Sequence, residues 1–243
     1  MAKTLSEAAA RLAELAARVE PDQRAAATQD GLDLLAVAAG LKPVGVLGCD
    51  DDRGDWPLGA AAVAYELDLG FQPDALWYPA RDARQAGLPN WYVTAVAARR
   101  ASRSALYVWR DPALEARVRQ ACARGRVTVA EEAALLGYPE CCVAQHHAQA
   151  LALEDLSIAA IVRQVPDDEG RHRLAAAGIV PLPRSPEEWR ELDALRAIAP
   201  EPATSINRCA ACVADPDGPA GQLGRRYREL ARALDYPVSA PAA

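Results

Sequence analysis

The sequence predicts an α/β protein, with α+β as the alternative, in which about four strands form a small sheet in the N-terminal half and helices fill the C-terminal half. The β-branched and aromatic runs typical of strands all fall before residue 126. From residue 127 the chain instead shows helix caps followed by helical spacing of apolar residues. We therefore expect an α/β lobe over residues 1–126 and a helical lobe over 127–243, which can also pack as one compact unit.

The first expected elements are two helices and a strand. Thr4 and Glu7 form a capping-box pattern that opens a helix ending before Pro21, and a second helix is expected over 22–39. The apolar, β-branched run at 43–48 is flanked by glycines and predicts a buried strand. The chain thus enters the sheet directly after a helical pair.

The next stretch contains the other expected strands. Residues 58–69 fit either a helix or a strand, and their alanines together with Pro57 favour a helix. Strands are expected at 75–78, 91–97 and 104–109. An arginine-rich connection separates the last two strands, which predicts a hairpin with a basic tip.

This basic hairpin is the predicted substrate-binding surface. Arg99, Arg100 and Arg103 lie in the connection, and Trp109 lies on the strand that follows. Arginines beside aromatic side chains can neutralise phosphate and stack on bases, which suits a nucleotide-like ligand or single-stranded nucleic acid. The simpler interpretation, which we favour, places the aromatic side chains in the core and the arginines on a solvated turn.

The helical half begins with a clear pair of boundaries. Thr128 and Glu131 form a second capping box, and Gly137 ends that short helix. Pro139 suits the first position of a new helix, which continues until Pro166. The remaining helices are expected at 111–124, at 185–198 and from about 223 to 234, with a polar loop and a short helix at 167–183.

Two cysteine pairs carry the predicted chemistry. Cys141 and Cys142 fall in the first turn of the helix that Pro139 starts, where free N–H groups and the helix dipole favour thiolates. Cys209 and Cys212 form a CxxC, the usual spacing for two ligands of one centre. Adjacent residues diverge by about 100° around a helix, so a cluster over the helix end suits them better than one ion. We expect a shared thiolate site, with a [4Fe–4S] cluster favoured, zinc as the alternative and copper third.

Cys49 and His146 are the candidate catalytic residues. Cys49 and the run Asp50–Asp52 follow the strand at 43–48, at the edge where open α/β sheets place ligands. A nucleophilic or sulfur-carrying role for Cys49 competes with the plainer interpretation of a solvated, aspartate-rich turn. His146 lies one helical turn after Cys142 and can serve as an extra ligand or a proton donor. Cys122 is expected to be structural.

Composition excludes several classes of protein. A net charge of −6 argues against general nucleic-acid binding, although ten arginines and only three acidic residues fall between Arg81 and Arg126. No apolar run approaches the roughly 20 residues of a membrane span, and the N-terminus has no unbroken apolar signal segment. We expect a cytoplasmic protein, in which six cysteines indicate metal binding or catalysis rather than disulfides.

The cysteine motifs resemble those of a known family. Leu136-Gly137-Tyr138-Pro139, Cys141-Cys142-Val143 and a later cysteine pair leading into Gly224-Arg225-Arg226-Tyr227 resemble the uncharacterised prokaryotic family called domain of unknown function four-eighty-three, over residues 128–235. Arg208 stands where that family often has a proline. More loosely, adjacent cysteines plus a CxxC are similar to the ligands of the iron–sulfur epoxyqueuosine reductases. That similarity implies that Cys141, Cys142, Cys209 and Cys212 hold a [4Fe–4S] cluster.

Three functions are compatible with such a site. The favoured prediction is an iron–sulfur enzyme that performs redox or sulfur-transfer chemistry on a small or nucleotide-like substrate, with an electron-donor protein as its partner. The alternative is a zinc-stabilised binding module for RNA or a protein partner. The third is a copper-handling protein. Neither the substrate nor the reaction follows from the residues alone.

Overall fold

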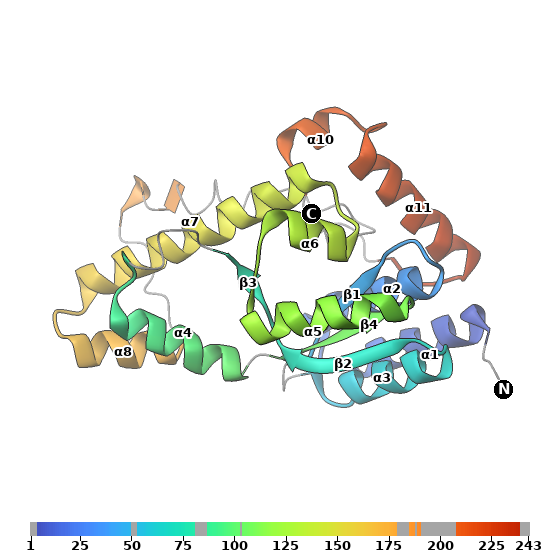
Figure 1. Cartoon of the computed structure of the whole chain (residues 1–243), viewed down its shortest axis with the longest axis horizontal. Helices are drawn as coiled ribbons and strands as arrows, with labels where there is room; N and C mark the ends of the chain where they lie inside the picture. The colour runs from blue at the N-terminus through green and yellow to red at the C-terminus, as the bar shows by residue number, and fades with distance from the viewer. Residues whose placement is uncertain are drawn as a thin grey trace.

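A small antiparallel sheet lies at the centre of the computed structural model, which describes residues 4–49, 53–80, 87–102, 104–178, 185–187, 189–190 and 208–238 (Figure 1). Its strands are β1 (Val44–Gly48), β4 (Ser104–Trp109) and β2 (Gly70–Ala75), in the order β1-β4-β2. Trp109 pairs with Val44 on one side and with Gly70 on the other, and both pairings are antiparallel. The central strand β4 is therefore the most buried.

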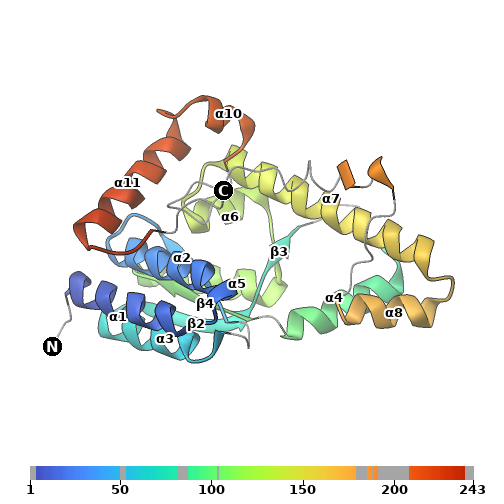
Figure 2. The ribbon, with the colours of Figure 1, turned by 180° about the vertical axis from the view of Figure 1, so that it is seen from behind.

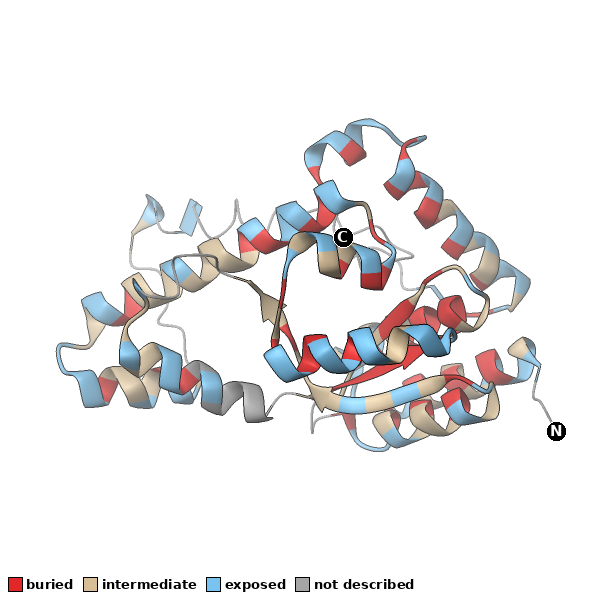
Figure 3. Cartoon of the chain, in the orientation of Figure 1, coloured by how far each residue is buried: buried red, intermediate tan, exposed pale blue. Residues whose placement is uncertain are grey.

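Helices cover both faces of this sheet. Helices α1 (Leu5–Arg18), α2 (Pro21–Ala38) and α3 (Trp56–Glu66) lie on one face, and α5 (Glu115–Arg124) lies on the other (Figures 1 and 2). A short 3₁₀ helix, Pro112–Leu114, leads into α5. These layers confirm the predicted α/β or α+β character of the N-terminal half and bury β1 and β4 between helices (Figure 3).

The second half is helical, as expected. Helix α6 (Val129–Leu136) is followed by the long α7 (Glu140–Gln164) and by α8 (Asp168–Ala176), which packs against α4 (Asn90–Ser102). Helices α10 (Ala210–Ala214) and α11 (Pro219–Ala233) lie near the start of α7, and the α4–α8 pair lies near its far end (Figures 1 and 2). A two-residue parallel ladder joins β3 (Tyr78–Pro79) to β5 (Arg126–Val127). None of the helices in these described ranges has the length and apolar character needed to cross a bilayer.

One predicted strand is wrong, and with it the basic hairpin. Residues 91–97 lie within the helix α4, whose Thr94 hydroxyl donates to the carbonyl of Asn90 one turn earlier. Ala95 is buried against Ile161 and Ala175, in a small apolar cluster to which α7 and α8 contribute. Packing against other helices thus outweighs the β preference of this stretch. The strand that pairs with β4 in place of residues 91–97 is β2. Only its last residue, Ala75, falls within a range for which the sequence predicts a strand.

A buried cation joins the sheet to the helical half. The ammonium of Lys42, just before β1, donates to Asp33 Oδ2 at 2.6 Å and to the hydroxyl of Tyr138 at 2.7 Å. The side chains of Lys42 and Asp33 are only 2% and 1% exposed. Burial by itself lowers the pKa of Lys42, but Asp33 and Tyr138 raise it more, so the pKa lies above its ordinary value and the lysine is charged. Since Tyr138 immediately precedes the N-cap of α7, this cluster holds the start of that helix.

A second buried pair lies at the other end of β1. The carboxylate of Asp30 on α2 accepts from Nη1 of Arg53 and, at 2.9 Å, from the backbone N–H of Gly48. Burial raises the pKa of Asp30 to about 6, while Arg53 and the Gly48 N–H oppose that rise. The nearby Asp33 raises the pKa of Asp30 further, because the two carboxylates lie one turn apart on α2.

We expect Lys42→Met to lower the free energy of unfolding by about 3–5 kcal/mol, because it leaves the carboxylate of Asp33 buried without its cation. Urea denaturation monitored by circular dichroism measures this change. The control is Arg119→Ala, which breaks an exposed pair with Glu115 and costs no more than about 0.5 kcal/mol. Equal costs for the two substitutions would show that the buried pair does not hold α7 on the sheet.

The pKa of Asp30 predicts a pH dependence of stability. Because the folded pKa of about 6 lies above the value of 3.8 for a free aspartate, ionisation of Asp30 opposes folding. Its contribution is most favourable below pH 4 and declines by about 3 kcal/mol as the pH rises from 4 through 6. Asp30→Asn removes this decline, so the difference in unfolding free energy between wild type and variant should change over that window. A pH-independent difference between wild type and Asp30→Asn would contradict the assignment.

Candidate metal centre

The corner between α6 and α7 follows the local signals in the sequence. The Thr128 hydroxyl accepts from the N–H of Glu131, and the Glu131 carboxylate accepts from the N–H of Thr128 at 2.9 Å, which completes the capping box. Gly137 ends α6 with φ of 72°, a left-handed conformation that favours glycine. A Cβ there would also lie 2.7 Å from Cδ of Pro43, so the close packing requires glycine as well. The chain therefore turns sharply into α7.

Both cysteine pairs lie at helix starts. Pro139 is the N-cap of α7 and not its first residue, so the helix begins one residue later than expected. Cys141 and Cys142 are therefore the second and third residues of the helix. Cys209 is the N-cap of α10, and Cys212 is the third residue of that five-residue helix. Free backbone N–H groups at these positions favour negative charge on the sulfurs.

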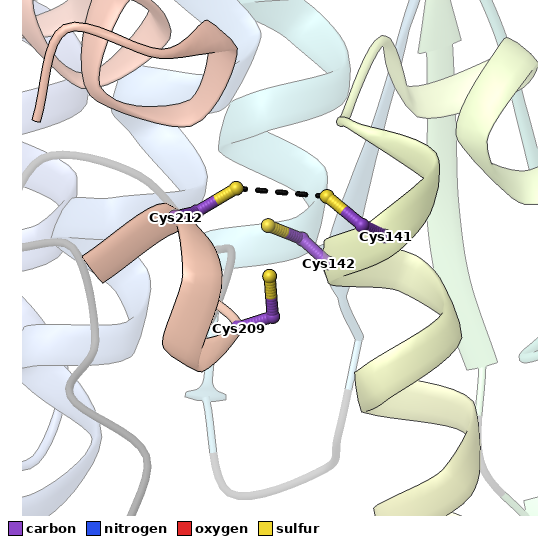
Figure 4. A group of neighbouring side chains, drawn as sticks. All are labelled: Cys141, Cys142, Cys209 and Cys212. Atoms are coloured by element: carbon purple, nitrogen blue, oxygen red, sulfur yellow. Dashed lines mark hydrogen bonds between the residues drawn. The ribbon is translucent and has the colours of Figure 1, made fainter. Parts of the chain in front are cut away.

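The four sulfurs converge between the two helix starts. Their Sγ atoms all lie within 4.8 Å of one another, and those of Cys141 and Cys212 are 3.5 Å apart (Figure 4). Cys142, Cys209 and Cys212 are buried, and Cys141 is exposed. The structure thus brings together both predicted pairs, which are separated by more than sixty residues of chain.

The four thiols differ in how readily they ionise. Burial raises the pKa of Cys142 and of Cys212, and for Cys212 the neighbouring thiols raise it further. Burial acts in the same direction at Cys209, but the N–H of Cys212 and the surrounding thiols outweigh it and lower the pKa of Cys209. One thiolate therefore forms first and makes a second one beside it more costly. A cation among the sulfurs removes this like-charge penalty, so metal binding would release protons from the site.

The donor set fits a thiophilic metal. Four thiolates arranged around one point are the ligands of zinc and of iron–sulfur centres, whereas magnesium and calcium need oxygen donors. Sulfurs at the corners of a tetrahedron around zinc, with a Zn–S distance of about 2.3 Å, lie about 3.8 Å apart. The Cys141–Cys212 separation of 3.5 Å and the upper limit of 4.8 Å for all pairs are compatible with that value. The site can therefore hold a metal through these four residues.

A histidine–carboxylate pair lies further along α7. The Nε2 atom of His147 is hydrogen-bonded to Glu132 Oε2, and the indole N–H of Trp77 donates to the other oxygen at 3.4 Å. His147 and Glu132 are both buried, so this pair joins α7 to α6 in the interior. His146 is exposed and is not one of the clustered ligands.

The other predicted site residues lie elsewhere in the fold. Cys49 follows β1 as expected, but its sulfur approaches the carbonyl of Leu47 at 3.7 Å and is not part of the four-sulfur group. Trp109 is 3% exposed and packs in the core on β4. Arg99 and Arg100 lie on helix α4, and Arg103 and Asp50–Asp52 fall outside the described residues. Their predicted roles stay predictions.

Sequence reasoning missed the polar residues that anchor the site. Lys42 and Lys3 are the only lysines among the 27 basic residues, which was a usable signal that Lys42 has a particular environment. The carboxylate of Glu132 and the indole of Trp77 carried no such signal, because a glutamate in the first turn of a helix is ordinary. Their partners come from distant parts of the chain.

Comparison of the chain with known protein families, with curated proteins and with solved structures finds no match. The fold and the site define a protein that combines a helix-covered antiparallel sheet with a helical second half. Four clustered cysteines in that second half can hold a metal.

Replacing one clustered cysteine should abolish tight metal binding. We expect Cys212→Ser to lose most of the metal that co-purifies with the wild type, because serine does not replace a thiolate as a soft ligand. Elemental analysis after gel filtration measures the stoichiometry. Cys49→Ser is the matched control, since it removes a thiol outside the group and should leave the metal content unchanged. Full metal retention by Cys212→Ser would remove that sulfur from the site.

Proposed function

We propose that this chain is a zinc-stabilised binding protein in which Cys141, Cys142, Cys209 and Cys212 hold a single ion. The observation that carries the proposal is the spacing of the four sulfurs, all within 4.8 Å of one another. Four protein thiolates complete a tetrahedral shell and leave no position for a substrate, which is the pattern of structural zinc sites. The metal would then contribute folding energy, and the function would reside in the surfaces that it holds in place.

The proposed role of the ion is to fix the C-terminal segment. Helix α10 has only five residues, too few to be stable by its own hydrogen bonds, and among the described elements it packs mainly on α11. The four sulfurs connect it to the start of α7 (Figure 4). An ion there would close a loop of more than sixty residues between the two pairs, which restricts the unfolded chain and favours the folded one.

An iron–sulfur enzyme is the second candidate, and the exposure of Cys141 favours it. An accessible cluster corner can receive electrons from a donor protein or contact a small or nucleotide-like substrate. The sulfur spacing argues the other way. In a [4Fe–4S] cluster each thiolate binds a different iron at a corner of the cluster, so the sulfurs stand around a larger body than one ion. We therefore place zinc first, and the resemblance to iron–sulfur reductases stays a prediction.

Purification without oxygen, followed by metal and sulfide analysis, separates the two candidates. We expect colourless protein with about one zinc per chain, no acid-labile sulfide and no visible absorption band. Removal of the zinc by a chelator should lower the melting temperature by about 10 °C, because losing a ligand present at about 1,000 times its Kd removes about 4 kcal/mol. Brown protein with about four iron atoms and sulfide would replace the zinc proposal with the cluster enzyme.

A further inference from the structure

One of the four clustered cysteines reaches the surface of the protein. Cys141 is exposed, whereas Cys142, Cys209 and Cys212 are buried, with at most 8% of each residue exposed. Oxidation of a cysteine depends on access to its sulfur and on its thiolate form, which is also the form that binds a metal. A small oxidant that arrives from solvent therefore meets the sulfur of Cys141 before it meets the other three.

The sulfur of Cys141 lies beside that of Cys212. The two Sγ atoms are 3.5 Å apart and point toward each other from the starts of α7 and α10 (Figure 4). A disulfide bond holds its sulfurs about 2.05 Å apart, so its formation requires an approach of about 1.5 Å. Cys142 is a poor partner for Cys141, because α-carbons joined by one peptide bond are about 3.8 Å apart and disulfides usually need about 4.4 Å or more. The geometry thus favours a bond between the two helix starts.

We propose that Cys141 and Cys212 form a reversible redox switch, which a peroxide converts from two metal ligands into a disulfide. The thiolate of Cys141 attacks one oxygen of hydrogen peroxide, so that an S–O bond forms, the O–O bond breaks and hydroxide leaves. The thiolate of Cys212 then attacks the sulfenic sulfur of Cys141, which forms the S–S bond and expels a second hydroxide. The two sulfurs lose two electrons, and the peroxide gains them.

This switch would release the metal and still hold the C-terminal segment in place. The bond uses two of the four ligands, and the thiolates of Cys142 and Cys209 alone do not complete a tetrahedral shell. The disulfide joins α7 to α10, as the metal does, and connects residues that are 71 positions apart. Closing this loop restricts the unfolded chain. The release of metal rests on the proposed function, whereas the formation of the disulfide does not.

Treatment of the full, metal-loaded chain with hydrogen peroxide tests this proposal. We expect peptide mapping, after alkylation of the remaining thiols, to find one disulfide, between Cys141 and Cys212, and a chromogenic chelator to detect the released zinc. Dithiothreitol with added zinc should reverse both changes. The oxidised chain should melt about 10 °C above the reduced, metal-free chain, because only the oxidised one has its loop closed.

Two results would overturn the redox switch. One is a disulfide between any other pair of cysteines, and the other is oxidation of Cys141 without a disulfide. The same peptide map of the chain after removal of its metal by a chelator should also show the Cys141–Cys212 bond, whichever metal the cysteines bind. A wrong metal assignment is therefore distinguishable from a wrong disulfide, because elemental analysis tests the first and the peptide map tests the second.

Single variants separate the disulfide from metal binding. Metal-free Cys142→Ser and Cys209→Ser should each still form the bond, although both have lost a metal ligand. Cys212→Ser should not form it and should instead accumulate a sulfenic acid on Cys141, which dimedone labels. Cys49→Ser is the control, since it removes a thiol outside the group, and should behave as wild type. Loss of the bond in Cys142→Ser and Cys209→Ser as well would contradict the assignment of the pair.

Discussion

The arrangement of this protein depends on one buried cation, Lys42, and on the groups that neutralise it. An unpaired ammonium in the interior is very costly, so the position of Lys42 fixes where Asp33 and Tyr138 must lie. Tyr227 of α11 is buried beside the same cluster, where burial and the charge of Asp33 raise its pKa. The strand β1, the start of α7 and the helix α11 therefore meet at one polar centre inside an otherwise apolar core.

The geometry of the cysteines follows from that meeting point. Cys141 and Cys142 come shortly after Tyr138, and the CxxC segment precedes α11, which carries Tyr227. Both cysteine-bearing segments are thus neighbours in sequence of residues that meet at this centre. Side chains held by packing and by hydrogen bonds to a second layer of residues lose little freedom on binding an ion, which favours high affinity.

Local signals predicted the elements that depend on few neighbours. The capping boxes at Thr4 and Thr128, the left-handed Gly137 and the proline before α7 are complete within a few residues, and the structure contains all of them. The CxxC and the adjacent pair were recognised for the same reason. Helix α4 was missed because its Trp, Tyr and Val residues favour a strand, and only contact with α8 makes the helix preferable. The side-chain partners of Lys42, Arg53 and His147 lie between 9 and 96 residues away along the chain, outside the spacings of helix and strand patterns, so those patterns do not predict them.

Two buried ion pairs lie at opposite ends of one short strand. Lys42 precedes β1 and pairs with Asp33, whereas Gly48 ends β1 and donates its N–H to Asp30, the partner of Arg53. Helix α2 serves both through Asp33 and Asp30, one turn apart, and each carboxylate has its own buried cation. Because like charges at that spacing repel, removing either cation would also change the electrostatic environment of the other pair. Helix α2 therefore couples the two ion pairs electrostatically.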